Sequence, residues 1–311
     1  MEITIRRLRK DELHDADRII RLAFGTFLGV PDPAQTFGDS DIAYTRYEAD
    51  PDAVLAAEAE GKLVGSNFVT NWGSFGFFGP LTVEPKLWNQ KVAQRLLEPT
   101  LEMFKSWGCR HSGLFTFSHS PTHLALYQKF GYWARFLTPV MSKQPAVSDG
   151  GPYTCFSKLA AHEKEAVLSA CRETTGKIDD GLDLSREIRA VEAHKLGDTI
   201  LLNHDSKVTA FAVCHVGPRT EAGSGVCYVK FGAVRPEAGA QNTFERLLDS
   251  CEAFAASKSA KLVAGVNLSH HEAYRTMVGR GFRTDLIGVA MQERNEPGYK
   301  RGGVYVLDDW R

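Results

Sequence analysis

The sequence predicts an α/β protein in which one unit of strands and helices occurs twice. Apolar runs with strand-like alternation are interleaved with segments whose apolar residues recur every three or four positions. At 311 residues, 43% of them hydrophobic, the chain is long enough for two domains. Marker residues also repeat, since Pro85 and Gly131 stand 46 positions apart and Pro236 and Gly281 stand 45 apart. We therefore expect two tandem domains, each a twisted mixed β-sheet flanked by helices.

The expected boundary between them is a stretch of proline, glycine and small polar residues. Residues 144–152 are QPAVSDGGP, a composition typical of a linker. We therefore divide the chain into an N-terminal domain over residues 1–143 and a C-terminal domain over residues 153–311.

The first half begins with a strand and a helix. Ile3 and Ile5 alternate with polar residues, as in a strand, and after Asp11 the apolar residues recur at helical spacing. The loop over residues 25–40 is rich in glycine, proline and aspartate, and either a substrate lid or a plain surface connection would fit it. The next expected elements are a helix at 42–48 and strands at 54–60 and 63–72, which Gly61-Lys62 joins as a hairpin.

A strand at 75–83 contains Gly79-Pro80. Proline cannot donate a hydrogen bond to a neighbouring strand, so this strand must bulge or splay there. A polar turn follows, and helical spacing resumes at Val92, with Pro99 predicting a kink or an early break. A strand that enters a helix through a short turn points free N–H groups and a helix dipole at one place, which predicts an anion site suited to a pyrophosphate.

The remaining elements follow the same rules. A strand is expected at 112–117, Ser120-Pro121 opens a helix that closes at Gly131, and a strand at 137–142 ends the first half. In the second half we expect strands at 153–158, 199–203, 208–216 and 226–234, and helices at 160–174 and 185–193.

The strand, turn and helix around Trp88 to Ala93 resemble the acetyl-CoA motif of the GNAT superfamily of N-acetyltransferases. The segment SPTHLALYQKFGY, residues 120–132, is similar to a second motif of that family. The family turn has the pattern Arg/Gln-x-x-Gly-x-Gly/Ala. In this chain Trp88 stands at its first position, Lys91 at its first glycine and Ala93 at its second.

The resemblance implies that acetyl-CoA is the cosubstrate and that its pantetheine arm pairs with the strand backbone at Leu81 and Val83. The residues expected to contact it are Leu81, Thr82, Val83, Trp88, Asn89, Gln90, Lys91, Val92, Ala93 and Gln94.

Two catalytic side chains are predicted. Tyr127, in the last turn of its helix, is the expected general acid for the departing CoA thiolate, and a half-buried aromatic is its structural alternative. His119 follows a strand and is the best-placed base, unless it is an ordinary loop histidine. His119 and His123 are four positions apart, but a helix begins between them and no partner carboxylate is evident, so we expect no metal site.

The second half is expected to keep the fold and lose the reaction. By the repeat spacing, Phe244 stands at the second glycine position of the turn and Met277 stands at the tyrosine position. A buried aromatic leaves no room for a pyrophosphate, and methionine has no proton to donate.

Composition excludes some partners. The net charge of −1 predicts no binding to nucleic acid or to anionic membranes. Six cysteines without a C-x-x-C pair predict reduced thiols and a cytoplasmic location. Neither a signal peptide nor an apolar run long enough to span a membrane is evident, and the oligomeric state stays open.

The predicted function is transfer of an acetyl or other short acyl group from acyl-CoA to a primary amine of a small molecule. A set of aromatic residues forms either the walls of a partly apolar acceptor site or an ordinary core: Phe24, Phe27, Trp72, Phe75, Phe77 and Trp88. A non-catalytic sensor that binds CoA or another small ligand is the main alternative, favoured by Lys91 in the turn. An aminoacyl transferase is a third, which the lack of a basic surface disfavours.

Overall fold

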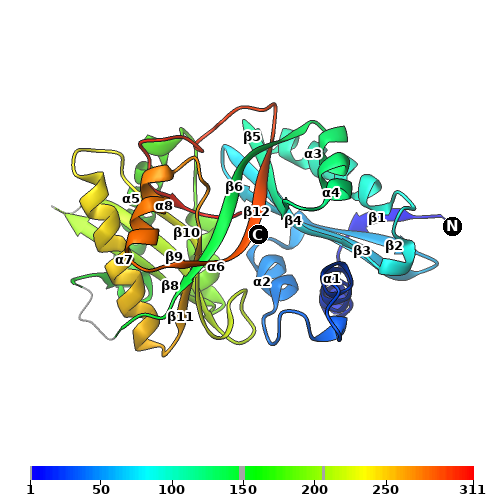
Figure 1. Ribbon diagram of the computed structural model, residues 1–311, viewed down its shortest axis with the longest axis horizontal. Helices are drawn as coiled ribbons and strands as arrows, with labels where there is room; N and C mark the ends of the chain where they lie inside the picture. Colours follow the sequence, from blue (N-terminus) through cyan, green and yellow to red (C-terminus); the bar gives the residue numbers. More distant parts are fainter. Residues whose placement is uncertain (1, 147–150, 205–206) are drawn as a thin grey trace.

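The computed structural model describes residues 2–146, 151–204 and 207–311, and within them 13 strands form one sheet flanked by eight α-helices (Figure 1). The strands are β1 (Thr4–Arg7), β2 (Val54–Ala59), β3 (Lys62–Trp72), β4 (Phe75–Val83), β5 (His111–Phe117), β6 (Tyr132–Lys143), β7 (Thr154–Cys155), β8 (Gly197–His204), β9 (Lys207–Gly217), β10 (Gly223–Val234), β11 (Lys261–Gly265), β12 (Arg283–Glu293) and β13 (Val306–Leu307). The helices are α1 (Leu13–Leu28), α2 (Ile42–Ala49), α3 (Val92–Ser106), α4 (Pro121–Lys129), α5 (Ala161–Ile178), α6 (Ser185–Ala193), α7 (Ala240–Ser257) and α8 (His271–Gly279). The predicted α/β class is confirmed. The linker predicted at 144–152 lies partly outside the described residues, so the domain division stays a prediction.

The two halves exchange one long strand each, β6 and β12. The strand order is β1-β2-β3-β4-β5-β12-β6-β11-β10-β9-β8-β7, with β13 paired to β10. Thus β12, from the second half, pairs with β5, and β6, from the first half, pairs with β11. The strands β6 and β12 also pair with each other, and they run together through the middle of the molecule (Figure 1). The exchange joins the sheets of the two halves into one, which the sequence pattern did not indicate.

Helices cover both faces of each half. In the first half, α1 packs with β2 and β3 on one face, while α3 and α4 pack on the other. In the second half, α5 and α6 cover one face, and α7 and α8 cover the opposite one. The two halves therefore follow the same order of helices and strands, as the repeated spacing predicts.

The core under α5 and α6 contains residues from both halves. Trp72, Phe75 and Phe77 of the first half are fully buried there, against side chains such as Phe231 and Trp310 of the second. Three of the six aromatic residues considered for the acceptor site are therefore core residues that hold the halves together.

Two local expectations are revised. Helix α3 continues through Pro99 to Ser106, so the early break is wrong and the kink stays a prediction. Pro99 and Arg95 line an open hollow, where water can bond the carbonyl that proline leaves without a partner. The strand expected at 153–158 is short, because only Thr154 and Cys155 pair with β8 before a 3₁₀ turn begins.

Two buried histidines predict how stability depends on pH. Burial lowers the pKa of His215 to about 4 and that of His270 to about 3. As pH falls through about 6.5, these histidines gain protons in the unfolded chain but stay neutral in the folded chain. Protonation therefore favours the unfolded chain, so the stability of the folded protein is complete above about pH 6.5 and is lost as pH falls toward the folded pKa values. Urea unfolding at pH 5.5 should therefore give a free energy of unfolding lower than at pH 7.5 by roughly 1 kcal/mol per histidine. His215→Gln should remove about half of this difference, and an undiminished difference would contradict the assignment.

Two further findings concern the cysteines and the lengths of the helices. All six cysteines are free thiols. Within the described ranges, no helix is both long and apolar enough to cross a lipid bilayer.

Candidate functional site

The central feature of the site is the gap between β4 and β5. These parallel strands pair only from Phe75 with His111 to Phe77 with Gly113. Beyond this point β4 bulges, since the register against β3 shifts between Phe78 and Leu81. The splay predicted at Gly79-Pro80 is therefore confirmed.

The free edge of β4 faces this gap. The Glu84 N–H donates to the Val64 carbonyl of β3 at 2.9 Å. Because the backbone groups of successive strand residues point to opposite sides, those of Leu81 and Val83 point away from β3, toward β5. These are the residues expected to pair with a pantetheine arm. One group is already bonded, because the Trp88 indole N–H donates to the Val83 carbonyl at 2.9 Å. The gap thus presents strand-like donors and acceptors to an extended ligand.

The N-terminus of α3 lies at the end of β4. Of the described side chains, none caps this helix, whereas the Ser120 hydroxyl accepts from the His123 N–H at the start of α4. The first N–H groups of α3, from Val92 to Gln94, are therefore available to an anion. Lys91, the residue before the helix, is exposed and adopts the left-handed conformation with φ of 62°. Lysine thus takes the backbone shape that glycine would adopt most easily.

The other predicted donor-site residues surround this turn. Trp88, Asn89 and Gln90 are exposed on it, Val92 packs its side chain into the core, and Ala93 is half-buried. The Gln94 amide oxygen accepts from Lys129 of α4 at 3.0 Å, while the Thr82 side chain is buried and its backbone pairs with Ser66. The structure therefore brings all ten residues to one strand end and one turn.

Tyr127 lies beside the point where the strands separate. It is 8% exposed, and its ring centroid is 5.8 Å from that of Phe78, the first β4 residue beyond the paired part. Burial raises the pKa of its hydroxyl well above the usual range, so the hydroxyl keeps its proton at neutral pH. Such a group can donate a proton without first having to gain one.

His119 lies outside this core, in an aromatic cluster at the end of β5. Its side chain is exposed and stacks on Phe27 of α1 at 5.9 Å. The ring of His123 is 4.8 Å from the same Phe27, and Phe117 packs against both histidines. Within the described residues, no group of three or more histidine, cysteine, aspartate or glutamate side chains could hold a metal ion.

The sequence suggested only one role for His123 of this cluster, that of a metal ligand. Its Nδ1 is buried and has no hydrogen-bond partner among the residues that the structure describes, and burial together with His119 lowers its pKa. The four-residue spacing from His119 drew attention to the pair in the sequence, but His119 precedes α4, so helical spacing does not account for the contact of both rings with Phe27.

In the second half, the corresponding gap is filled by the chain itself. There β10 and β11 pair from Val226 to Val229 and then separate, as β4 and β5 do. The short strand β13 enters the gap and pairs with Gly232 and Ala233, and the carbonyl of Tyr305, the residue before it, accepts from the Val234 N–H at 3.1 Å. Counted from the first residues that pair, Phe75 and Val226, Gly232 and Val234 correspond to Leu81 and Val83. The C-terminal segment therefore makes the main-chain bonds that a pantetheine arm would make in the first half.

The role predicted for Phe244 is wrong, although its burial is confirmed. The turn between Val234 and Ala240 is three residues shorter than the turn between Val83 and Val92, so Phe244 is the fifth residue of α7 and corresponds to Leu96. Its ring packs in the core, 5.1 Å from Tyr305. The residue at the start of α7 is Gly239, in the left-handed conformation. What fills this gap is β13, and Met277 does occupy the buried position that corresponds to Tyr127.

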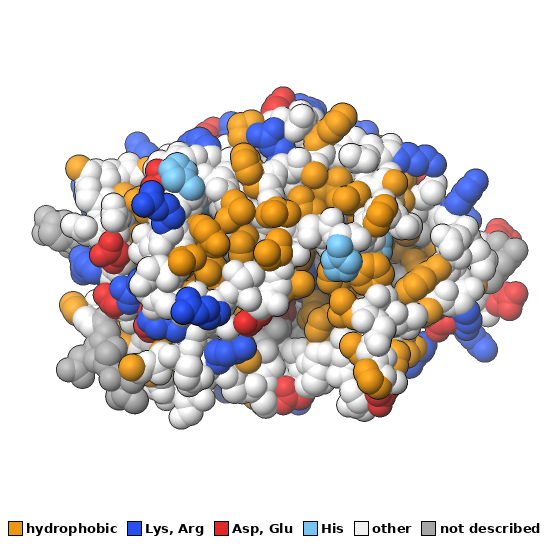
Figure 2. All heavy atoms as spheres, in the orientation of Figure 1, with side chains coloured by type: hydrophobic (Ala, Val, Ile, Leu, Met, Phe, Trp, Pro, Cys, Tyr) orange, Lys and Arg blue, Asp and Glu red, His pale blue; other side chains and the backbone are white. Residues whose placement is uncertain are grey.

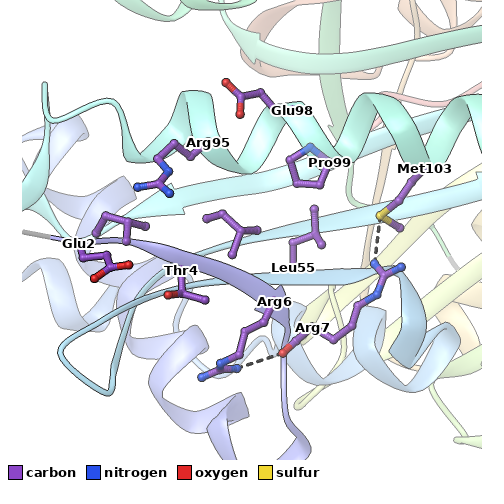
Figure 3. Close-up of a pocket in the computed structure, with 11 residues that line it drawn as sticks. Glu2, Thr4, Arg6, Arg7, Leu55, Arg95, Glu98, Pro99 and Met103 are labelled. Atoms are coloured by element: carbon purple, nitrogen blue, oxygen red, sulfur yellow. Dashed lines mark hydrogen bonds between the residues drawn. The ribbon is translucent and has the colours of Figure 1, made fainter.

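A separate hollow of about 670 Å³ lies between β1 and α3 (Figure 3). Side chains of both charges surround it, among them Arg6, Arg95 and Glu98, and the Arg7 guanidinium contacts the Met103 sulfur at 3.0 Å. None of the predicted site residues lines it, so it is distinct from the gap between β4 and β5.

Comparison with known proteins agrees with this arrangement. The chain is similar to a candidate acetyltransferase structure from Pyrococcus horikoshii, at 15% identity over 96% of this chain and 92% of that one, with a TM-score of 0.67. It is also similar to a GCN5-related N-acetyltransferase from Sphaerobacter thermophilus, at 13% identity over 95% and 96% of the two chains, with a TM-score of 0.58. No curated protein sequence matches the chain. These similarities show the class of fold, which the chain shares with such structures over nearly its whole length.

A family match covers part of the first half. Residues 17–132 match the sequence model of the Acetyltransferase (GNAT) family, so the resemblance to that family is confirmed over this segment. The matched segment contains the gap between β4 and β5, the uncapped start of α3 and Tyr127. This match supports acyl transfer as the general reaction.

Proposed function

We propose that the first half binds acyl-CoA and transfers its acetyl or other short acyl group to a primary amine of a small molecule. The observation that carries this proposal is the unpaired edge of β4 at Leu81 and Val83, which leads directly to the uncapped N-terminus of α3. An extended pantetheine arm suits the first feature, and a pyrophosphate suits the second.

The proposed chemistry uses groups placed around this gap. The amine nitrogen attacks the thioester carbonyl and forms a C–N bond, the C–S bond breaks, and the Tyr127 hydroxyl protonates the departing thiolate. The new amide nitrogen then loses its extra proton, which restores the Tyr127 hydroxyl directly or through water. The attacking amine must be neutral, so we assign removal of its proton to His119, directly or through water. His123 packs against the same Phe27 ring and has a lowered pKa, so it stays uncharged and adds no repulsion to a cationic acceptor.

The surface beside the aromatic cluster suggests an acceptor with an apolar part. Figure 2 shows hydrophobic side chains gathered over the middle of the face where β6 and β12 run together in Figure 1. Exposed Phe136, Leu137 and Ile287 belong to these two strands, and Phe117 of the cluster pairs with Gly288, next to Ile287. Exposed apolar surface of this kind is typical of binding sites.

The main alternative is a protein that binds the donor without transferring the acyl group. It is favoured by the Trp88 bond to the Val83 carbonyl, which removes one acceptor from the gap. The test is the release of free thiol from acetyl-CoA in the presence of amines with increasingly long alkyl or aromatic groups. Thiol release that depends on the amine supports transfer, whereas binding without release supports the alternative, and absence of binding contradicts both.

Lys91 gives a prediction about the pyrophosphate. Its exposed ammonium lies at the uncapped end of α3, so Lys91→Glu should weaken acetyl-CoA binding by about tenfold or more through charge reversal. Lys105→Glu makes the same change at the other end of the helix and should have little effect. Calorimetric titration of both variants measures the difference, and equal affinities would contradict charge pairing at Lys91.

A further inference from the structure

A cluster of charged side chains is buried where the two halves meet. The Glu221 carboxylate accepts from the Lys230 ammonium at 2.5 Å and from Arg46 at 3.0 Å, and Lys230 also pairs with Glu187 at 3.1 Å. Each of these four side chains is only 4% exposed. Two cations and two anions balance, and removing one partner would leave a buried charge uncompensated.

Arg46 connects this cluster to the gap between β4 and β5. Its Nε and Nη2 donate to the two oxygens of Glu221, at 3.2 and 3.0 Å, and its Nη1 donates to the carbonyl of Gly79. Its guanidinium also lies over the Phe77 ring, 5.8 Å from the centroid. Phe77 is the last β4 residue paired with β5, and Gly79 lies in the bulge that follows. Arg46 therefore contacts β4 on both sides of the point where the strands separate.

The shape of the cluster argues against a ligand site. The cavity beside Arg46, Glu187 and Lys230 holds about 10 Å³, room for about one water molecule. The charges are directed at one another, and among the described residues the cluster reaches β4 through Arg46, which bonds the Gly79 carbonyl and lies over the Phe77 ring.

We infer that Arg46, held by Glu221 of the second half, is a positioning residue that keeps the gap between β4 and β5 open for the acyl donor. A rigid, planar guanidinium can bond a carboxylate with two arms and a carbonyl with the third, which lysine cannot do. The second half thus contributes to donor binding although β13 fills its own gap. The part of this inference that concerns the donor rests on the proposed function.

The first test needs no ligand. Amide hydrogen exchange should be about tenfold faster over residues 75–84 in Arg46→Lys than in the unchanged protein, while exchange in β8 and β9 stays the same. Glu221→Gln should give the same local pattern, and it serves where Arg46→Lys folds poorly. Arg280→Lys is the matched control, since Arg280 also pairs with a carboxylate, Glu252 at 2.9 Å, away from β4.

The second test measures the donor. Arg46→Lys and Glu221→Gln should each raise the Kd for acetyl-CoA about 5- to 20-fold, and the double variant should add little, because both changes break one unit. In assays of turnover, KM for the donor should rise with kcat nearly unchanged.

The outcomes separate the two claims. Unchanged exchange over residues 75–84, or equally faster exchange in all strands, would overturn the inference, because the cluster would then only hold the halves together. Local acceleration in a protein that binds no acetyl-CoA would keep the positioning role of Arg46 and overturn the proposed function. A Kd within twofold of the unchanged protein in both variants would overturn the link to donor binding.

Discussion

Tyr127→Phe should lower the turnover number by about 10- to 10⁴-fold and leave the affinity for acetyl-CoA nearly unchanged. The change removes one hydroxyl and keeps the ring against Phe78, so packing at the start of the gap is preserved. The lost group is needed only when the thiolate leaves. Initial-rate measurements with the best amine of the panel, together with a donor titration, separate the two parameters.

Tyr132→Phe is the matched control for this variant. Tyr132 is also buried and also packs on Phe78, with 5.6 Å between the ring centroids. Its hydroxyl, however, bonds Ser112 at 3.0 Å within the core. The control should cost some stability and little turnover. Full activity of Tyr127→Phe would show that water or another residue protonates the sulfur.

Trp310→Ala should lower the free energy of unfolding by about 3 to 5 kcal/mol. Trp310 is 2% exposed, its ring stacks on Phe75 at 4.5 Å, and its indole N–H donates to the Tyr299 hydroxyl at 2.7 Å. It also fills the space above Gly113, where a β-carbon would lie 2.5 Å from its ring. The C-terminal segment thus reaches from the gap in the second half to the paired ends of β4 and β5 in the first.

Urea unfolding of Trp310→Ala and of Trp133→Ala measures this effect. Trp133 is 50% exposed, so its removal should cost less than about 1 kcal/mol. Similar losses in the two variants would mean that the C-terminal segment contributes little to the shared core, contrary to its packing.

The elements with local causes could be predicted from the sequence. Gly79-Pro80 predicted the splay because proline removes a donor whatever lies around it, and Ser120-Pro121 predicted the start of α4 for similar reasons. The anion site predicted at the turn before α3 followed from a strand, a polar stretch and a helix in succession. Such features depend on a few neighbouring residues.

The strand exchange and the role of β13 depend on contacts between distant residues. Nothing in the composition of β12 distinguishes pairing with β5 from pairing within its own half, and β13 contains only two paired residues. The wrong placement of Phe244 in the turn before α7 has a specific cause. The second turn is three residues shorter and α7 is three residues longer than α3, so the spacing from Pro236 to Gly281 stayed nearly constant while the register inside it shifted.

The sequence also did not indicate the roles of Arg46 and His123. A charged residue on a short helix is expected at the surface, and only the fold shows that Arg46 faces Glu221 from a different half of the chain. His123 drew attention through its spacing from His119, but its partner proved to be the aromatic ring of Phe27.

A crystal structure with bound acetyl-CoA tests the central claim most directly. We expect one donor molecule per chain, with its pantetheine arm along Leu81 and Val83 and its pyrophosphate at the start of α3 beside Lys91. The strand β13 should stay paired with Gly232 in the second half. A donor bound at α7 with β13 displaced, or a donor in the hollow between β1 and α3, would contradict this assignment.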